Sequence, residues 1–121
     1  MNEQVQTELK KILNGRFSTS ESTRANYARG EDTYDPVLSK AVVFPETNEE
    51  VSKILSICND HKIPVVPFGT GTSLEGNVVG NDNGITISLE KMNKVLSVNV
   101  EDFDCRVQAC VTREQLNDYL R

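Results

Sequence analysis

One stretch has the residue types and spacing of a ligand-binding loop: P-F-G-T-G-T-S-L-E-G, from Pro67 to Gly76. Glycines stand at 69, 71 and 76, hydroxyl residues follow Gly71, and the stretch contains no lysine or arginine. Successive backbone N–H groups in such a turn form a nest, which with the Thr72 and Ser73 hydroxyls can surround a pyrophosphate without a basic side chain. From spacing alone, a loop that merely turns the chain after a strand is an equally good interpretation.

Two common phosphate-binding motifs do not fit this stretch. A P-loop has two glycines five residues apart, followed by Lys and then Ser or Thr. Gly71 and Gly76 have that spacing, but Asn and Val follow them. A Rossmann turn, counted from Gly69, places Leu74 at the third glycine position, and no clear helix follows. A backbone nest is therefore the remaining phosphate-binding interpretation.

Short apolar runs on both sides of the loop predict the elements that position it. The runs 41–44, closed by a proline, and 63–67 are typical of buried strands. Thr47, with a glutamate three residues later, has capping-box spacing and predicts a helix over 48–61. Strand, helix and strand form a βαβ unit, for which we expect parallel pairing and a right-handed crossover. After the loop, residues 85–89 alternate apolar and hydroxyl side chains, as in a half-buried strand.

The other predicted elements are helices at 3–13 and 21–28, strands at 94–100 and 105–109, and a final helix that begins after Thr112. The remainder of the polar stretch 16–36 is expected to be loop. The apolar pattern of the final helix still runs at Arg121, so we expect a truncated piece of a longer protein. The fold class is α+β, with a helical segment and loop over 1–37 and the ordered remainder over 38–121.

Composition limits the function classes. With 121 residues, 26% charged and 37% hydrophobic, the chain fits one small globular domain and has no transmembrane segment. A formal charge of −5 without a Lys/Arg cluster excludes nucleic acid as the expected partner. The N-terminus lacks the basic start and apolar run of a secretory signal, which predicts an intracellular, cytoplasmic location.

No residue has the pattern of a catalytic group or a metal ligand. The three cysteines, Cys58, Cys105 and Cys110, lack metal-ligand spacing, and we expect buried structural thiols. The single histidine, His61, falls at the end of a predicted helix, where a polar cap is the expected role. The acidic residues over 101–104 indicate a solvated turn.

Several blocks occur in the order and spacing of a known family. The run I-P-V-V-P-F-G-T-G-T-S-L-E-G is followed by G-I-T-I-S-L-E-K-M-N-K-V-L, then E-D-F-D-C-R-V-Q and V-T-R-E-Q-L-N-D-Y-L. Over roughly 38–121, the chain resembles the first FAD-binding segment of the vanillyl-alcohol oxidase and p-cresol methylhydroxylase superfamily. Within it, the closest likeness is to the FAD-linked D-lactate dehydrogenase and glycolate oxidase D-subunit group. The resemblance favours the nest interpretation of the loop.

The resemblance implies an FAD-binding domain of the p-cresol methylhydroxylase type, with FAD between two α+β subdomains and its pyrophosphate on the glycine loop. On that likeness the cofactor-binding residues are Pro67, Phe68, Gly69, Thr70, Gly71, Thr72, Ser73, Gly76 and Asn77. The parent protein would oxidise a 2-hydroxy acid such as D-lactate or glycolate, with the substrate residues lying outside this chain. The isolated chain is then expected to be inactive and to bind FAD weakly or not at all. The alternatives are a non-catalytic nucleotide- or phosphate-binding module and a self-associating subdomain.

Two residues depart from the family pattern. Asn77 stands where the family often has glycine, a mild change because asparagine tolerates left-handed backbone. Cys110 stands at a usual glycine position. If the backbone there has positive φ or lies against the cofactor, Cys110 would add strain or crowding of about 1 kcal/mol or more.

Overall fold

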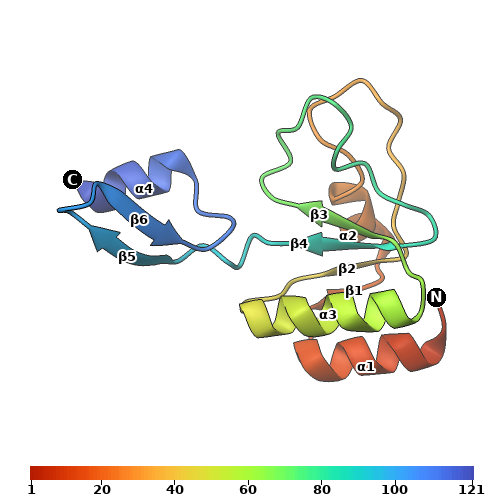
Figure 1. The fold of residues 1–121 in the computed structure, drawn as a ribbon. Coiled ribbons are helices and arrows are strands. Elements are labelled where there is room, and N and C mark those ends of the chain that lie inside the picture. Colours follow the sequence, from red (N-terminus) through yellow and green to blue (C-terminus); the bar gives the residue numbers. More distant parts are fainter.

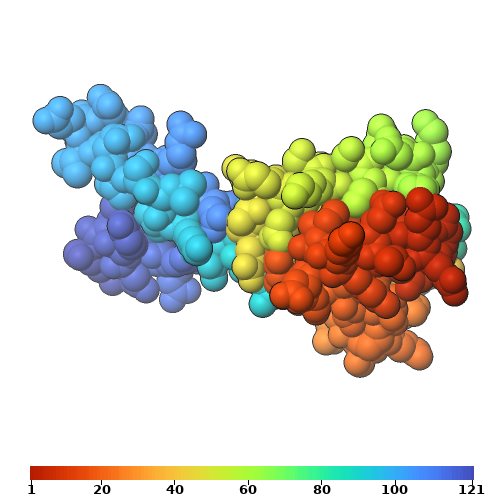
Figure 2. Space-filling model, turned by 90° about the horizontal axis from the view of Figure 1, so that it is seen from below, coloured from red at the N-terminus to blue at the C-terminus, as the bar shows by residue number.

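The structure, a computed structural model, describes residues 1–121 as two parts that form separate lobes (Figures 1 and 2). The larger lobe contains a four-stranded sheet in the order β1-β2-β4-β3. Its elements are α1 (Glu3–Leu13), β1 (Phe17–Ser18), α2 (Glu21–Asn26), β2 (Ala41–Val43), α3 (Asn48–Asp60), β3 (Val65–Phe68) and β4 (Ile85–Ser88). The smaller lobe contains β5 (Val95–Asn99), β6 (Asp104–Val107) and α4 (Arg113–Leu120). The predicted α+β class is confirmed.

The βαβ unit differs from the prediction in one respect. β2 precedes α3 in the chain and β3 follows it, and the two strands run parallel. They do not pair with each other, because β4 lies between them (Figure 1). Ile85 of β4 is opposite Ala41 on one side and Val65 on the other. The pairing of β2 with β3 is therefore wrong, and β4 is the central strand of the parallel part.

This central position explains a second difference. Residues Ile85–Ser88 are all buried, although their alternating pattern predicts a half-buried strand. The Thr86 hydroxyl lies 2.8 Å from the Ser39 hydroxyl, and Ser39 Oγ also accepts a hydrogen bond from the Asn81 N–H at 3.1 Å. Hydroxyls with such partners can be buried at little cost. Ser39 belongs to the chain between α2 and β2, so this segment supplies the partner of Thr86 on this face of the sheet.

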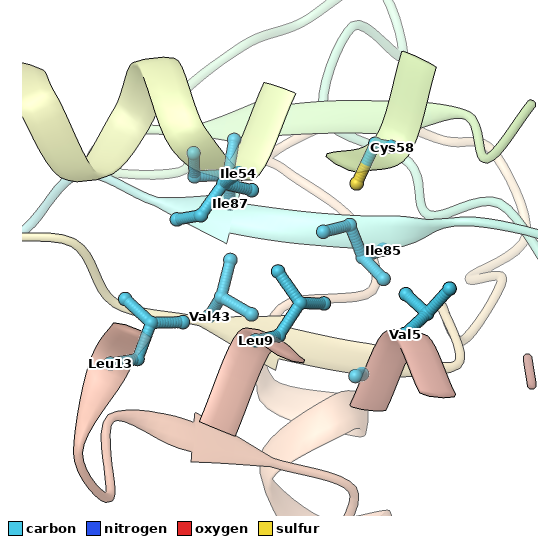
Figure 3. Close-up of a cluster of buried hydrophobic side chains, with 9 residues drawn as sticks. Val5, Leu9, Leu13, Val43, Ile54, Cys58, Ile85 and Ile87 are labelled. Atoms are coloured by element: carbon cyan, nitrogen blue, oxygen red, sulfur yellow. The ribbon is translucent and has the colours of Figure 1, made fainter. Parts of the chain in front are cut away.

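The hydrophobic core lies on the opposite face of the sheet (Figure 3). Its fully enclosed side chains come from α1, α3 and the strands β2 and β4: Val5, Leu9, Leu13, Ala41, Val43, Ile54, Cys58, Ile85 and Ile87. α1 has the predicted bounds, and α3 begins where predicted but ends at Asp60, with His61 as its C-cap. The Thr47 hydroxyl accepts a hydrogen bond from the Glu50 N–H at the start of α3, and Asn14 has φ 45° at the end of α1. α1 thus belongs to the same core as the strands.

Arg16 joins the N-terminal segment to α3. Its guanidinium donates to the Phe44 carbonyl at 3.0 Å and to Glu50 Oε1 at 2.8 Å, and a second hydrogen bond joins its other terminal nitrogen to Glu50 Oε2. Glu50 also accepts from the Glu46 N–H at 2.8 Å. The hydrogen bond from Arg16 lowers the pKa of Glu50 to about 2. This bidentate pair fixes the chain between α1 and β1 to the start of α3.

The smaller lobe has no core of its own: no residue after Met92 is buried. β5 and β6 pair with each other only, and α4 packs beside them (Figure 1). Cys105 is consequently exposed on β6, so the expectation of a buried thiol is wrong there, whereas Cys58 is buried as predicted. His61 lies at the C-cap of α3, where its N–H donates to the Ile57 carbonyl at 3.2 Å. None of the helices is long and apolar enough to cross a membrane.

Candidate functional site

The glycine loop begins at the carboxyl end of β3, at the edge of the parallel strands (Figure 1). In open parallel sheets, ligands bind at the carboxyl ends of the strands. Gly71 has φ +75° and Gly76 has φ +76°, so these positions need glycine for their backbone conformation. Gly69 has no positive φ, and a Cβ built there would meet no protein atom within 4 Å. Nothing inside the protein therefore requires glycine at 69, and the space above it is open.

An aromatic platform supports the loop from below. The Phe68 ring is buried, and a Cβ on Gly71 would lie 2.6 Å from its Cζ. The Tyr27 ring meets Phe68 edge-on at 5.0 Å between centroids and meets Phe44 at 5.5 Å. The Tyr27 hydroxyl donates to Glu90 at 2.6 Å, and burial followed by this hydrogen bond raises the pKa of Tyr27 to about 12. The buried Phe68 ring thus packs on the protein side of the loop, against Gly71.

Hydrogen bonds within the loop fix its curvature. The Ser73 hydroxyl donates to Asn77 Oδ1 at 2.6 Å, and the Thr70 and Thr72 hydroxyls lie 3.3 Å apart. The Val79 N–H donates to the Gly76 carbonyl at 3.2 Å. Asn77 has no positive φ, so its replacement of a glycine requires no left-handed backbone. Pro67, the first residue of the loop stretch, is exposed in β3.

The backbone donors of the loop have no partner inside the protein. None of the N–H groups from Gly69 to Asn77 donates a hydrogen bond to another protein atom. Backbone N–H groups normally find an acceptor, in the protein or outside it. A run of free amides on a glycine loop, with no acidic side chain between Gly69 and Ser73, suits an anion such as a pyrophosphate. The loop therefore fits the phosphate part of FAD.

The polar stretch before β2 supplies residues that the sequence reading missed. The Glu31 N–H donates to the Ser73 carbonyl at 3.1 Å. A Cβ on Gly30 would lie 2.8 Å from the same carbonyl oxygen, and the Tyr34 ring lies against Gly76. The only local signal for these contacts is a glycine between two tyrosines, Tyr27 and Tyr34, in an otherwise polar stretch. This signal does not indicate which residues the stretch contacts.

A cleft of about 370 Å³ separates the loop from the smaller lobe. Its walls are Gly69 and Thr70 on one side and the residues from Ala109 to Arg113 on the other. The volume is at the low end of the roughly 300–1,000 Å³ typical of ligand sites, and Arg113 is the one cationic residue in the lining. A glycine loop with free amides that faces a second wall across a cleft has the features of a nucleotide-binding site.

Cys110 lies in that second wall. It has no positive φ, and its N–H donates to the Met92 carbonyl at 2.9 Å, so the left-handed strain considered for this position is absent. Burial, followed by the charge of Glu90, raises the pKa of its thiol. The thiol is half-buried, and its residue lines the cleft opposite Gly69. The contact with a cofactor considered for this residue stays a prediction.

Comparisons with known proteins specify the nucleotide. Residues 39–121 match the model of a family described as an FAD binding domain. The chain therefore belongs to this family of FAD-binding domains. The probable mitochondrial D-lactate dehydrogenase of Danio rerio is 42% identical over 104 residues, which cover 86% of this chain and 21% of that protein. The glycolate oxidase subunit GlcD of Bacillus subtilis is 32% identical over 92 residues, 76% of this chain and 20% of that protein.

Solved structures confirm the fold. Alkyldihydroxyacetonephosphate synthase matches 99% of this chain and 25% of its own with a TM-score of 0.89 at 20% identity. p-Cresol methylhydroxylase matches 97% of this chain and 24% of its own with a TM-score of 0.82 at 23% identity. The fold expected from the resemblance to the p-cresol methylhydroxylase superfamily is thus confirmed. The curated relatives confirm the likeness to the D-lactate dehydrogenase and glycolate oxidase group. The chain spans about a fifth of the length of the curated relatives it matches.

Proposed function

We propose that this chain supplies the pyrophosphate-binding loop of an FAD-dependent oxidoreductase that acts on a 2-hydroxy acid of the D-lactate or glycolate class. The observation that carries the proposal is the run of unpartnered N–H groups from Gly69 to Asn77 at the sheet edge. The amides of Gly69, Thr70, Gly71, Thr72 and Ser73 would donate to phosphate oxygens. Gly76 and Asn77 would close the turn, while Pro67 and Phe68 would hold it on β3 from the protein side.

The residues present indicate which role belongs to this chain and which belongs to the cofactor. Bound FAD supplies the hydride-accepting chemistry of the parent protein. The residues of this chain bind and orient the phosphates, and the aromatic platform under Gly71 keeps the donors in place. No group of His, Cys, Asp or Glu residues here could hold a metal ion, and His61 caps α3 ahead of the start of β3, whereas the loop follows the end of that strand. We therefore propose that the isolated chain has no turnover of its own.

We also propose the division of the chain that the resemblance implies. Residues 38–121 form the first part of the FAD-binding domain, and residues 1–37 form a helical segment and loop packed against it. A cytoplasmic location stays a prediction, and the Danio rerio relative is mitochondrial by name.

The direct experiment is to purify residues 1–121 and measure FAD binding by the quenching of flavin fluorescence, together with lactate-dependent dye reduction. We expect weak, saturable binding that ADP competes away, and no dye reduction. Clear turnover would contradict the proposal that the isolated chain is inactive. Saturable binding that ADP leaves unchanged would contradict the pyrophosphate site.

A second candidate function is self-association through the smaller lobe. A groove of about 440 Å³ there is lined mostly by apolar residues: Val98, Val100, Phe103, Cys105, Leu116 and Leu120. The Phe103 side chain is 96% exposed. Exposed apolar patches of this kind mark interaction surfaces. Light scattering over a range of concentrations tests this candidate: a growing mass supports it, and a constant monomer mass excludes it.

A further inference from the structure

The segment from Ala28 to Tyr34 lies along one side of the glycine loop, and two of its residues meet backbone carbonyl oxygens of the loop. The Glu31 N–H donates to the Ser73 carbonyl at 3.1 Å. The Cβ position of Gly30 is 2.8 Å from that oxygen and 3.1 Å from the Gly71 carbonyl oxygen. The segment therefore meets the loop at its acceptors.

The geometry of the peptide bond then gives the direction of the neighbouring N–H groups of the loop. In a planar trans peptide the C=O of one residue and the N–H of the next point in opposite directions. With the carbonyls of Gly71 and Ser73 facing the segment, the N–H groups of Thr72 and Leu74 point away from it. The segment thus determines which way these two free donors of the loop face.

Two further features adapt the segment to this position. Gly30 has no positive φ, so a larger residue there is opposed by contacts alone, including one of 2.8 Å to Val78 Cγ2. The Tyr34 ring comes within 3.0 to 3.5 Å of the Cβ position of Gly76, at the far end of the loop. Tyr34 is 52% exposed, so its ring contributes little to the core.

We propose that Ala28–Tyr34 is a positioning strap for the anion-binding loop, in which the bare backbone of Gly30 and the ring of Tyr34 set the orientation of the loop amides. This inference rests on the proposed function, because it describes how the pyrophosphate site is preorganised. Binding is weakened when the donors of a site must be ordered by the ligand itself. The strap therefore changes affinity for the cofactor more than it changes the stability of the fold.

The test compares four variants of the full chain by FAD affinity, thermal unfolding and the ¹⁵N order parameters of the ligand-free loop. Tyr34→Ser should raise the dissociation constant for FAD roughly three- to tenfold, the expected effect of lost preorganisation. It should also lower the order parameters of Thr72 and Leu74 while leaving the unfolding temperature nearly unchanged. Tyr34→Phe, which keeps the ring, should restore the wild-type values.

Gly30→Ala should weaken FAD binding by roughly tenfold or more, because the methyl group displaces two loop carbonyls at once. Gly84→Ala is its matched control: a Cβ at Gly84 would lie 2.3 Å from the Pro64 carbonyl oxygen, at the opposite end of β3. Gly84→Ala should lower stability yet leave the FAD dissociation constant of the folded protein unchanged.

The outcomes separate this inference from the proposed function. Wild-type protein that binds no FAD refutes the proposed function, and the order parameters of the ligand-free loop then decide whether the strap positions it. Wild-type protein that binds FAD, with Tyr34→Ser and Gly30→Ala binding equally well, overturns the strap alone. Equal losses in Gly30→Ala and Gly84→Ala also overturn it, because both would then report general destabilisation.

Discussion

Replacing Gly69 by alanine tests whether the ligand or the fold requires glycine at this position. Gly69 has no positive φ, and its added Cβ would meet no protein atom within 4 Å. A Gly→Ala change at a compatible position stabilises a protein by about 0.4–1 kcal/mol, because the unfolded chain loses freedom. We therefore expect Gly69→Ala to be as stable as the wild type or slightly more stable in urea unfolding.

The same methyl group would occupy open space at a residue whose amide we propose as a phosphate donor and which lines the cleft. It would hold a phosphate away from the amides of Gly69 and Thr70. Hydrogen bonds to charged groups are worth roughly 1.5–3 kcal/mol each, so losing one of them weakens binding by about ten- to a hundredfold. Competition between FAD and ADP in flavin fluorescence measures this loss.

A glycine that serves the ligand and not the fold predicts retained stability together with lost affinity in Gly69→Ala. Equal FAD affinity in wild type and Gly69→Ala would show that no phosphate lies above Gly69. A loss of stability in Gly69→Ala would show that the glycine serves the fold.

Three further perturbations test the supporting structure. Gly71→Ala should destabilise the protein by at least about 1 kcal/mol in urea unfolding, since it combines φ +75° with a clash against the Phe68 ring, and a neutral result would contradict this loop geometry. Glu50 has a folded-state pKa lowered from 4.5 to about 2, so its contribution is present above pH 4.5 and is lost as the pH falls toward 2. The gap in unfolding temperature between wild type and Glu50→Gln should shrink across that range, and a constant gap would argue against the ion pair. Tyr27→Phe removes the hydrogen bond to Glu90 and should cost about 0.5–1.5 kcal/mol in urea unfolding with the ring stack kept; an unchanged midpoint would show that this bond adds nothing.

Local signals in the sequence predict most of the secondary structure. The i, i+4, i+8 spacing of Val5, Leu9 and Leu13 and the capping residue Thr47 each depend on neighbours within two turns, and the structure confirms both helices. The glycines at 71 and 76 are similarly explained by their own backbone angles.

Long-range pairing is what the sequence does not reveal. Nothing local in Ile85–Ser88 says that this strand inserts between two earlier strands, and its hydroxyls become buried because Ser39 reaches Thr86 from 47 residues away. Exposure of Cys105 likewise depends on which layers cover β6.

The candidate site divides in the same way. The loop is recognisable from its composition, but its support is not. Glu31 and Ser73 are joined by a backbone hydrogen bond across 42 residues, and backbone donors leave no trace in side-chain patterns. The wall containing Cys110 meets Gly69 only through the arrangement of the two lobes.

The central claim, that the free amides of the glycine loop bind the pyrophosphate of FAD, is tested most directly by a ¹⁵N amide titration of residues 1–121 with ADP and with FAD. The amide signals from Gly69 to Ser73 should shift first and furthest with both ligands, while those of His61 and Lys62, at the other end of β3, stay in place. Loop amides that do not move with either ligand, or shifts centred elsewhere on the chain, would contradict the account.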